Sequence, residues 1–139
     1  SKPQSMNLGL PDKDDDPTKK KDIKVDEFRT MTILLGDNNK LIRYNGLLET
    51  PISVPKDFTY GKDGIRKELL SRKKAVLEYS TAKGKPKKGM IVIIKPGKKS
   101  NYRNLVDVLD EMGIVEVPTY AIVNDISDEE QKLVNEMNK

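Results

Sequence analysis

The five apolar residues from Met90 to Ile94 limit the possible folds of this chain more than any other feature. An unbroken apolar run of this length is typical of a strand that is buried on both faces or lies centrally in a sheet. A helix is expected next, because apolar residues recur at helical spacing at Tyr102, Leu105, Val106, Leu109 and Met112. Residues 119–123 then predict another strand. The order strand, helix, strand permits a crossover between parallel strands.

The chain before this unit predicts a β-hairpin and a second long helix. Residues 28–35 and 41–44 have strand patterns, and Gly36-Asp37-Asn38-Asn39 between them favours a turn. The helix is expected to begin at Gly61 or Asp63 and to end within residues 79–82. Its apolar stripe is formed by Ile65, Leu69, Leu70, Val76 and Leu77.

A short helix is expected at the C-terminus, where Ser127 and Glu130 form a capping-box pattern. Ser100 is the expected N-cap of the preceding helix. Because each main helix has one apolar stripe, both are expected on the same face of the sheet. The predicted class is α+β, with two main helices packed on one face of a small mixed β-sheet (order β-β-α-β-α-β), plus the short C-terminal helix.

The first residues differ in character from the rest. Residues 1–22 contain Pro3, Pro11, Pro17 and the mixed-charge run 12–16, which predicts a flexible linker before a domain over 23–139. Residues 47–61 are expected to be irregular. At the start of the domain Ile23 and Val25 alternate with charged residues. This pattern predicts either a linker with chance apolar residues or a strand that adds to a sheet edge and binds a partner, with Phe28 as its third candidate contact.

The composition argues against most catalytic sites. The chain has no Cys and no His, which excludes thiolate and imidazole metal sites, cysteine nucleophiles and histidine bases. Gly97-Lys98-Lys99-Ser100 lacks the glycine spacing of a phosphate-binding loop. Asp107, Asp110 and Glu111 are adjacent on a helix, but a solvated face explains them better than a metal or acid/base site. We therefore expect no enzyme activity and no cofactor.

Charge is divided unequally along the chain. Residues 56–103 hold fifteen basic and four acidic residues, whereas residues 104–139 hold two basic and nine acidic residues. One interpretation is that solvated faces of opposite charge offset each other. The other is a basic face that binds an anionic surface. Seven aromatic residues and a net charge of +4 do not favour nucleic acid. The candidates for an anionic surface are Arg66, Lys73, Lys74, Lys87 and Lys88.

The stretch from Met90 to Asn124 resembles the extracytoplasmic domain of the ExbD/TolR family of biopolymer-transport proteins, most closely ExbD-like proteins of Bacteroidetes type. The family has an apolar strand that ends in a basic residue, a Tyr that opens a helix of the form Y-x-x-L-V-x-V-L-D, a corner with Gly, and a final strand. The matching residues are Lys95, Tyr102, Leu105, Val106, Val108, Leu109, Asp110, Gly113 and 121–123. The resemblance covers about residues 22–125.

The resemblance implies a periplasmic domain on a single inner-membrane anchor upstream of residue 1, and a homodimer. It implies work with an ExbB/TolQ-like channel, by which the proton motive force acts on a TonB-like protein for outer-membrane transport. The family's proton-carrying Asp belongs to the absent membrane helix. Tyr102, Tyr120 and Ile122 are candidates for a dimer or partner surface, although the helical stripe favours a core position for Tyr102. The alternative is a TolR-like module that binds cell-wall peptidoglycan or another anionic surface.

Overall fold

The computed structural model describes residues 5–8 and 27–137 of the 139-residue chain. The strands are β1 (Ser5–Leu8), β2 (Thr30–Leu35), β3 (Leu41–Asn45), β4 (Lys56–Phe58), β5 (Ile91–Pro96) and β6 (Thr119–Val123). The helices are α1 (Ile65–Ala82), α2 (Tyr102–Val115), α3 (Asp128–Met137) and the short 3-10 helix η3 (Glu27–Arg29). No helix within these ranges has the length and apolar character needed to cross a bilayer.

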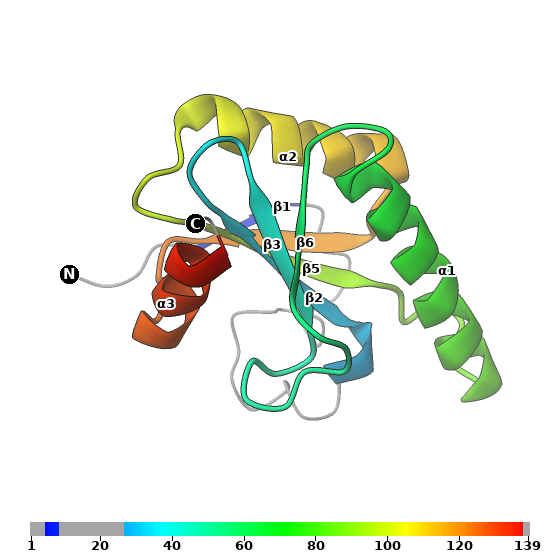
Figure 1. Ribbon diagram of the computed structural model, residues 1–139. Coiled ribbons are helices and arrows are strands. Elements are labelled where there is room, and N and C mark those ends of the chain that lie inside the picture. The colour runs from blue at the N-terminus through cyan, green and yellow to red at the C-terminus, as the bar shows by residue number, and fades with distance from the viewer. Residues whose placement is uncertain (1–4, 9–26, 138–139) are drawn as a thin grey trace.

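The strands form one mixed sheet in the order β1-β6-β5-β2-β3-β4 (Figure 1). β5 runs parallel to both of its neighbours, β2 and β6, and the other pairs are antiparallel. The apolar run thus lies inside the sheet, as predicted, because its side chains find apolar partners on neighbouring strands and helices. The α+β class is confirmed. The predicted order β-β-α-β-α-β is matched only in part: β2, β3, α1, β5, α2 and β6 follow it, but β1 precedes them and β4 lies between β3 and α1.

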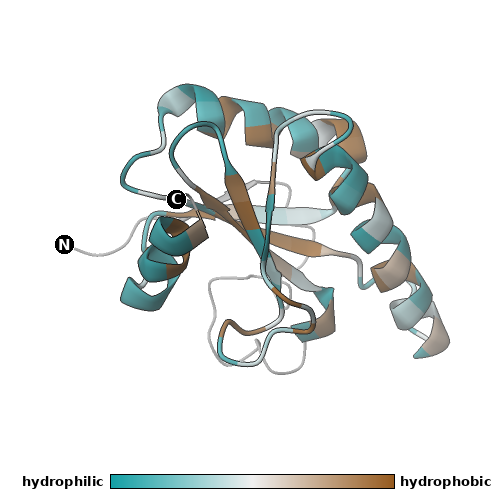
Figure 2. Cartoon of the chain, viewed as in Figure 1, coloured by the Kyte–Doolittle hydropathy of each residue, from teal (hydrophilic) through white to brown (hydrophobic). Residues whose placement is uncertain are grey.

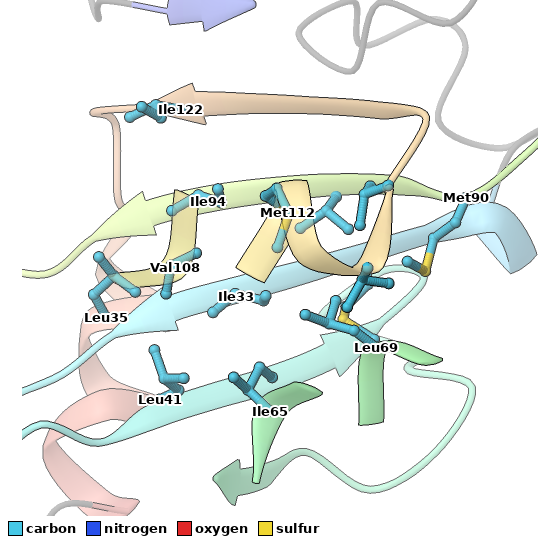
Figure 3. Packing of buried hydrophobic residues seen from close by; sticks show 14 of the residues in the cluster. Ile33, Leu35, Leu41, Ile65, Leu69, Met90, Ile94, Val108, Met112 and Ile122 are labelled. Carbon is cyan, nitrogen blue, oxygen red and sulfur yellow. The ribbon is translucent and has the colours of Figure 1, made fainter. Parts of the chain in front are cut away.

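The two main helices cover one face of the sheet, as predicted, and α3 covers the other face (Figure 1). Ile65 and Leu69 of α1 and Val108 and Met112 of α2 point toward Ile33 and its neighbours in the sheet (Figure 3). Leu34 points to the opposite face, where it packs with Val134 of α3. Figure 2 shows the central strands as hydrophobic between these layers.

Two strands were not expected from the sequence. β1 lies in the segment predicted to be a linker, and β4 lies in the segment predicted to be irregular. Each is short, and each pairs along one side with a longer strand, β6 or β3. The other residues of the expected linker lie outside the described ranges.

Three expectations about the helices were wrong in detail. Leu70 and Leu77 are 52% and 51% exposed, so they lie at the margin of the α1 stripe instead of in the core. Tyr102 is 80% exposed, because it is the first residue of α2 and precedes the turn that contacts the sheet. The N-cap of α2 is Asn101 and not Ser100, whose hydroxyl donates to the Gly97 carbonyl.

The start of α2 is joined to the hairpin between β2 and β3. The Asn101 side chain accepts from the Asn104 backbone N–H at 2.9 Å, and the Asn104 side chain accepts from the Asn101 N–H at 3.1 Å. The Asn104 amide also donates to Asn39 Oδ1 at 2.8 Å, and Asn39 has a left-handed backbone in the hairpin turn. The buried Asn104 therefore connects two elements that are distant in sequence.

Replacing Asn104 with Ala is expected to lower the free energy of unfolding by about 1–3 kcal/mol, since one helix-capping bond and one interelement bond are lost. Urea unfolding followed by circular dichroism measures the change. Arg103→Ala, at an exposed neighbouring position, is the control and should change stability by less than about 0.5 kcal/mol. Equal stability of the two variants would contradict a structural role for the Asn104 amide.

Candidate interaction surfaces

The two edges of the sheet differ in how well they could pair with an added strand. β4 has three residues, two of which are the exposed Lys56 and Asp57. The ammonium of Lys56 and the guanidinium of Arg43 both lie 5.3 Å from the centroid of the Phe58 ring. A short, charged edge strand is unfavourable for adding another strand. The β4 end of the sheet is therefore a poor site for a partner.

The other end is built from β6 and the N-terminal strand β1. The two strands pair antiparallel, with Ser5 opposite Val123 and Leu8 opposite Tyr120. Main-chain hydrogen bonds along β6 are thus made with a segment far away in sequence. The pairing shows that the side of β6 that faces away from β5 accepts an added strand.

The three residues predicted for a dimer or partner surface are in different environments. Ile122 is 4% exposed and belongs to the main core, so it is not a surface residue. Tyr120 is half-buried and packs against the same core. Tyr102 alone of the three is widely exposed. The structure does not bring these side chains together as one surface patch.

The residues predicted for strand addition are also separated by the fold. Ile23 and Val25 lie outside the described residues. Phe28 lies in η3, where its ring stacks on Tyr79 with centroids 4.3 Å apart. The guanidinium of Arg72 covers the ring at 4.2 Å and donates to the Phe28 carbonyl. Phe28 is therefore packed within its own chain and is not part of an extended strand.

The five basic residues predicted to bind an anionic surface differ in their contacts and in their exposure. Arg66 makes a two-point ion pair with Glu111, at 2.7 Å from Nε and 3.2 Å from a terminal nitrogen, and this hydrogen bond raises the Arg66 pKa. Lys73 donates to the Val115 carbonyl at 2.9 Å, where α2 ends. A cation at this end of a helix is favourable. These two basic residues hold α1 against α2.

The other three basic candidates are on α1 and in the loop after it. Lys74 and Lys87 are exposed, and Lys88 is partly buried. The three acidic residues of α2, Asp107, Asp110 and Glu111, do not converge on one point. Glu111 forms an ion pair with Arg66, and Asp110 is exposed. Among the residues the structure describes, no group of three or more acidic side chains is placed to hold a metal ion.

The sequence predicted only part of the hydrogen bonding of Glu130, a buried residue near the start of α3. Glu130 and Ser127 form the predicted capping box, with bonds of 2.9 and 3.0 Å. In addition Glu130 accepts from the Tyr44 hydroxyl at 2.6 Å and from the Lys95 ammonium at 2.9 Å. Burial raises the pKa of Glu130, but the bonds from Ser127, Tyr44 and Lys95 outweigh it and lower the pKa below its ordinary value. The carboxylate thus fastens α3 to β3 and β5.

Sequence reasoning missed the connection to the sheet because Tyr44 and Glu130 are 86 residues apart. The available signals were a basic residue at the end of an apolar strand and an acidic residue in a capping box. Neither signal indicates that the two side chains meet. Since both Glu130 oxygens accept bonds from the chain itself, the group is suited to holding α3 and not to transferring a proton.

Comparison of the chain with models of protein families, with curated proteins and with solved structures found no match.

Proposed function

We propose that this chain is the periplasmic domain of a membrane-anchored ExbD-like subunit. With an ExbB/TolQ-like channel, the subunit would pass the energy of the proton gradient to a TonB-like protein for outer-membrane transport. The observation that carries the proposal is the pairing of β1 with β6. A segment that would lie next to the membrane anchor extends the sheet at an edge where a partner strand can be received.

The physical mechanism is strand addition. A partner segment that replaces β1, or that pairs with its outer side, gains main-chain hydrogen bonds without needing a pocket. β1 is only four residues long, so few bonds are lost when it is replaced. Two anchored copies of the domain and a tethered partner raise the local concentration of each strand, and weak pairing is then sufficient. The arrangement of β2, β3, α1, β5, α2 and β6 supports the ExbD-like interpretation but does not identify the partner.

The test is a titration of the ¹⁵N-labelled chain with the periplasmic segment of a TonB-like protein from the same organism. We expect amide shifts along β6 and along β1, because an added segment would change the main-chain pairing of both strands. A segment of scrambled sequence is the control. Absence of shifts in both regions would argue against strand addition, and shifts confined to β4 would place the binding edge at the wrong end of the sheet.

The second candidate is a TolR-like module that binds peptidoglycan or another anionic surface. Lys74 and Lys87 favour it, because both are exposed. Arg66 and Lys73 favour it less, because their bonds to α2 already use their charged groups. We therefore keep the coupling domain as the main proposal.

A further inference from the structure

Four of the large apolar side chains that remain exposed lie on the two main helices; Tyr102 is the first residue of α2, and the other three lie further along the helices. Leu70 and Leu77 of α1 are 52% and 51% exposed, and Ile114 of α2 is 55% exposed. Neither main hydrophobic cluster includes them. Their exposure is unusual beside a core that buries Leu69 and Val76 of the same helix completely.

The contacts between the helices place these residues along one seam. Arg66 binds Glu111, and Lys73 binds the Val115 carbonyl, so residues 66–73 run alongside residues 111–115. Leu70 is four residues after Arg66 and three before Lys73, so it lies in the same row along α1 as these two residues. Leu77 continues this stripe after two turns, about 10 Å further along the helix. Ile114 is three residues after Glu111, so the two side chains are neighbours on the surface of α2.

Lysines repeat with the leucines. Lys67 and Lys74 are each three residues before a leucine, and both are exposed. The seven-residue spacing of both pairs keeps them on one side of the helix, where long lysine stems can lie beside the leucines with their ammonium groups outside. We name the set Leu70, Leu77, Ile114, Lys67 and Lys74 the leucine–lysine surface.

The basic character continues beyond this surface in the segments before and after α1. Further exposed lysines flank it, namely Lys62, Lys83, Lys85 and Lys87. The exposed acidic residues of α1 and the turn before it are Asp63 and Glu78, so lysine predominates. Exposed Asp110 and Glu116 belong to α2 and its cap, which confines the basic region to the α1 side of the seam. In Figure 1, α1 lies at the outside of the molecule, with its C-terminal end projecting from the sheet.

We propose that the leucine–lysine surface docks this domain on a bilayer that contains anionic phospholipid. Apolar side chains enter the boundary of the acyl chains, while lysines bind the phosphate groups above it. A sugar polymer or a nucleic acid would satisfy the lysines but would leave the leucines without a partner. The alternation of both kinds of side chain on one helix face therefore favours lipid. The inference does not depend on the proposed coupling function.

The experiment measures sedimentation of the full chain with vesicles of phosphatidylcholine alone or with one third phosphatidylglycerol. We expect binding to the anionic vesicles at low salt, loss of binding at 0.5 M salt, and little binding to the neutral vesicles. The double variants Leu70→Gln/Leu77→Gln and Lys67→Gln/Lys74→Gln should each reduce partitioning about tenfold. Thermal unfolding of each variant confirms that it is folded.

Matched controls use the same substitution elsewhere. Val54→Gln removes an apolar side chain that is 81% exposed in the loop before β4, and Lys132→Gln removes an exposed charge on α3. Both should bind vesicles as the unchanged chain does. No binding to anionic vesicles would overturn the proposal. Vesicle binding that is unchanged in Leu70→Gln/Leu77→Gln would also overturn it. So would retention by purified cell wall that equals retention by anionic vesicles and is likewise unchanged in Leu70→Gln/Leu77→Gln.

Discussion

Replacing Glu130 with Ala is expected to lower the free energy of unfolding by about 2–4 kcal/mol. The substitution removes the acceptor of three bonds, from Tyr44, Lys95 and the Ser127 backbone N–H. The buried Tyr44 hydroxyl would lose its partner on α3, and the capping box would lose one of its two bonds. Since these bonds attach α3 to the sheet, we expect α3 to separate from the Leu34 side of the sheet before the main core unfolds.

The variant Glu130→Gln separates charge from hydrogen bonding. Glutamine at this capping position can still accept from the Ser127 N–H, but it has no charge for Lys95. We therefore expect Glu130→Gln to be more stable than Glu130→Ala and less stable than the unchanged chain at neutral pH. Asp128→Asn, at an exposed position of the same helix turn, controls for loss of one negative charge near a helix start.

The direction of the Glu130 pKa shift determines how its contribution to folding stability changes with pH. The Glu130 pKa lies below its ordinary value of 4.5, so the folded chain holds this carboxylate ionised more strongly than the unfolded chain does. Its contribution to stability is therefore complete above about pH 4.5 and is lost as the pH falls through the folded-state pKa. The difference in stability between the unchanged chain and Glu130→Gln should shrink below pH 4.5.

Urea unfolding between pH 3 and pH 7 measures this difference, because the other carboxylates titrate alike in both proteins. Hydrogen exchange of the α3 amides reports its detachment separately. A difference that stays constant with pH would show that the charge of Glu130 does not stabilise the α3 contact. A Glu130→Ala variant as stable as the unchanged chain would show that the whole bonded group is dispensable.

The sequence predicts best the elements whose own residues carry a strong pattern. The run from Met90 to Ile94 indicated the buried strand, and the Gly36–Asn39 turn indicated the hairpin. Both patterns are local, and both elements are where they were expected. The capping box at Ser127 was also correct, because its two partners are three residues apart.

The elements that were missed depend on neighbours distant in the chain. β4 contains two charged residues and has no strand pattern of its own, so its pairing with β3 holds it in place. Phe28 was predicted to contact a partner by strand addition, but its ring packs against Tyr79 and Arg72 of α1. The bond between Tyr44 and Glu130 is likewise set by the packing of α3 on the sheet. Alternation and helical spacing contain no information about such pairings.

The apolar stripe of α1 offers the sharpest contrast between neighbouring residues, and it gives the second large prediction. Leu69→Ala is expected to lower the free energy of unfolding by about 2–5 kcal/mol, because the side chain is fully buried and its removal leaves a cavity. Leu70→Ala should lower it by less than about 1 kcal/mol, since half of that side chain is already in water. Both substitutions remove the same atoms and insert the same residue, which has the highest helix propensity.

The two variants therefore differ in burial alone, and their comparison tests the rotation of α1 about its axis. Urea unfolding with a common m-value measures both changes. Equal losses would mean that Leu70 packs as deeply as Leu69, and the leucine–lysine surface would then not be available to lipid. A large loss confined to Leu69→Ala would fix the face of α1 that packs on the sheet, and would leave Leu70 and Leu77 on the outside with the lysines.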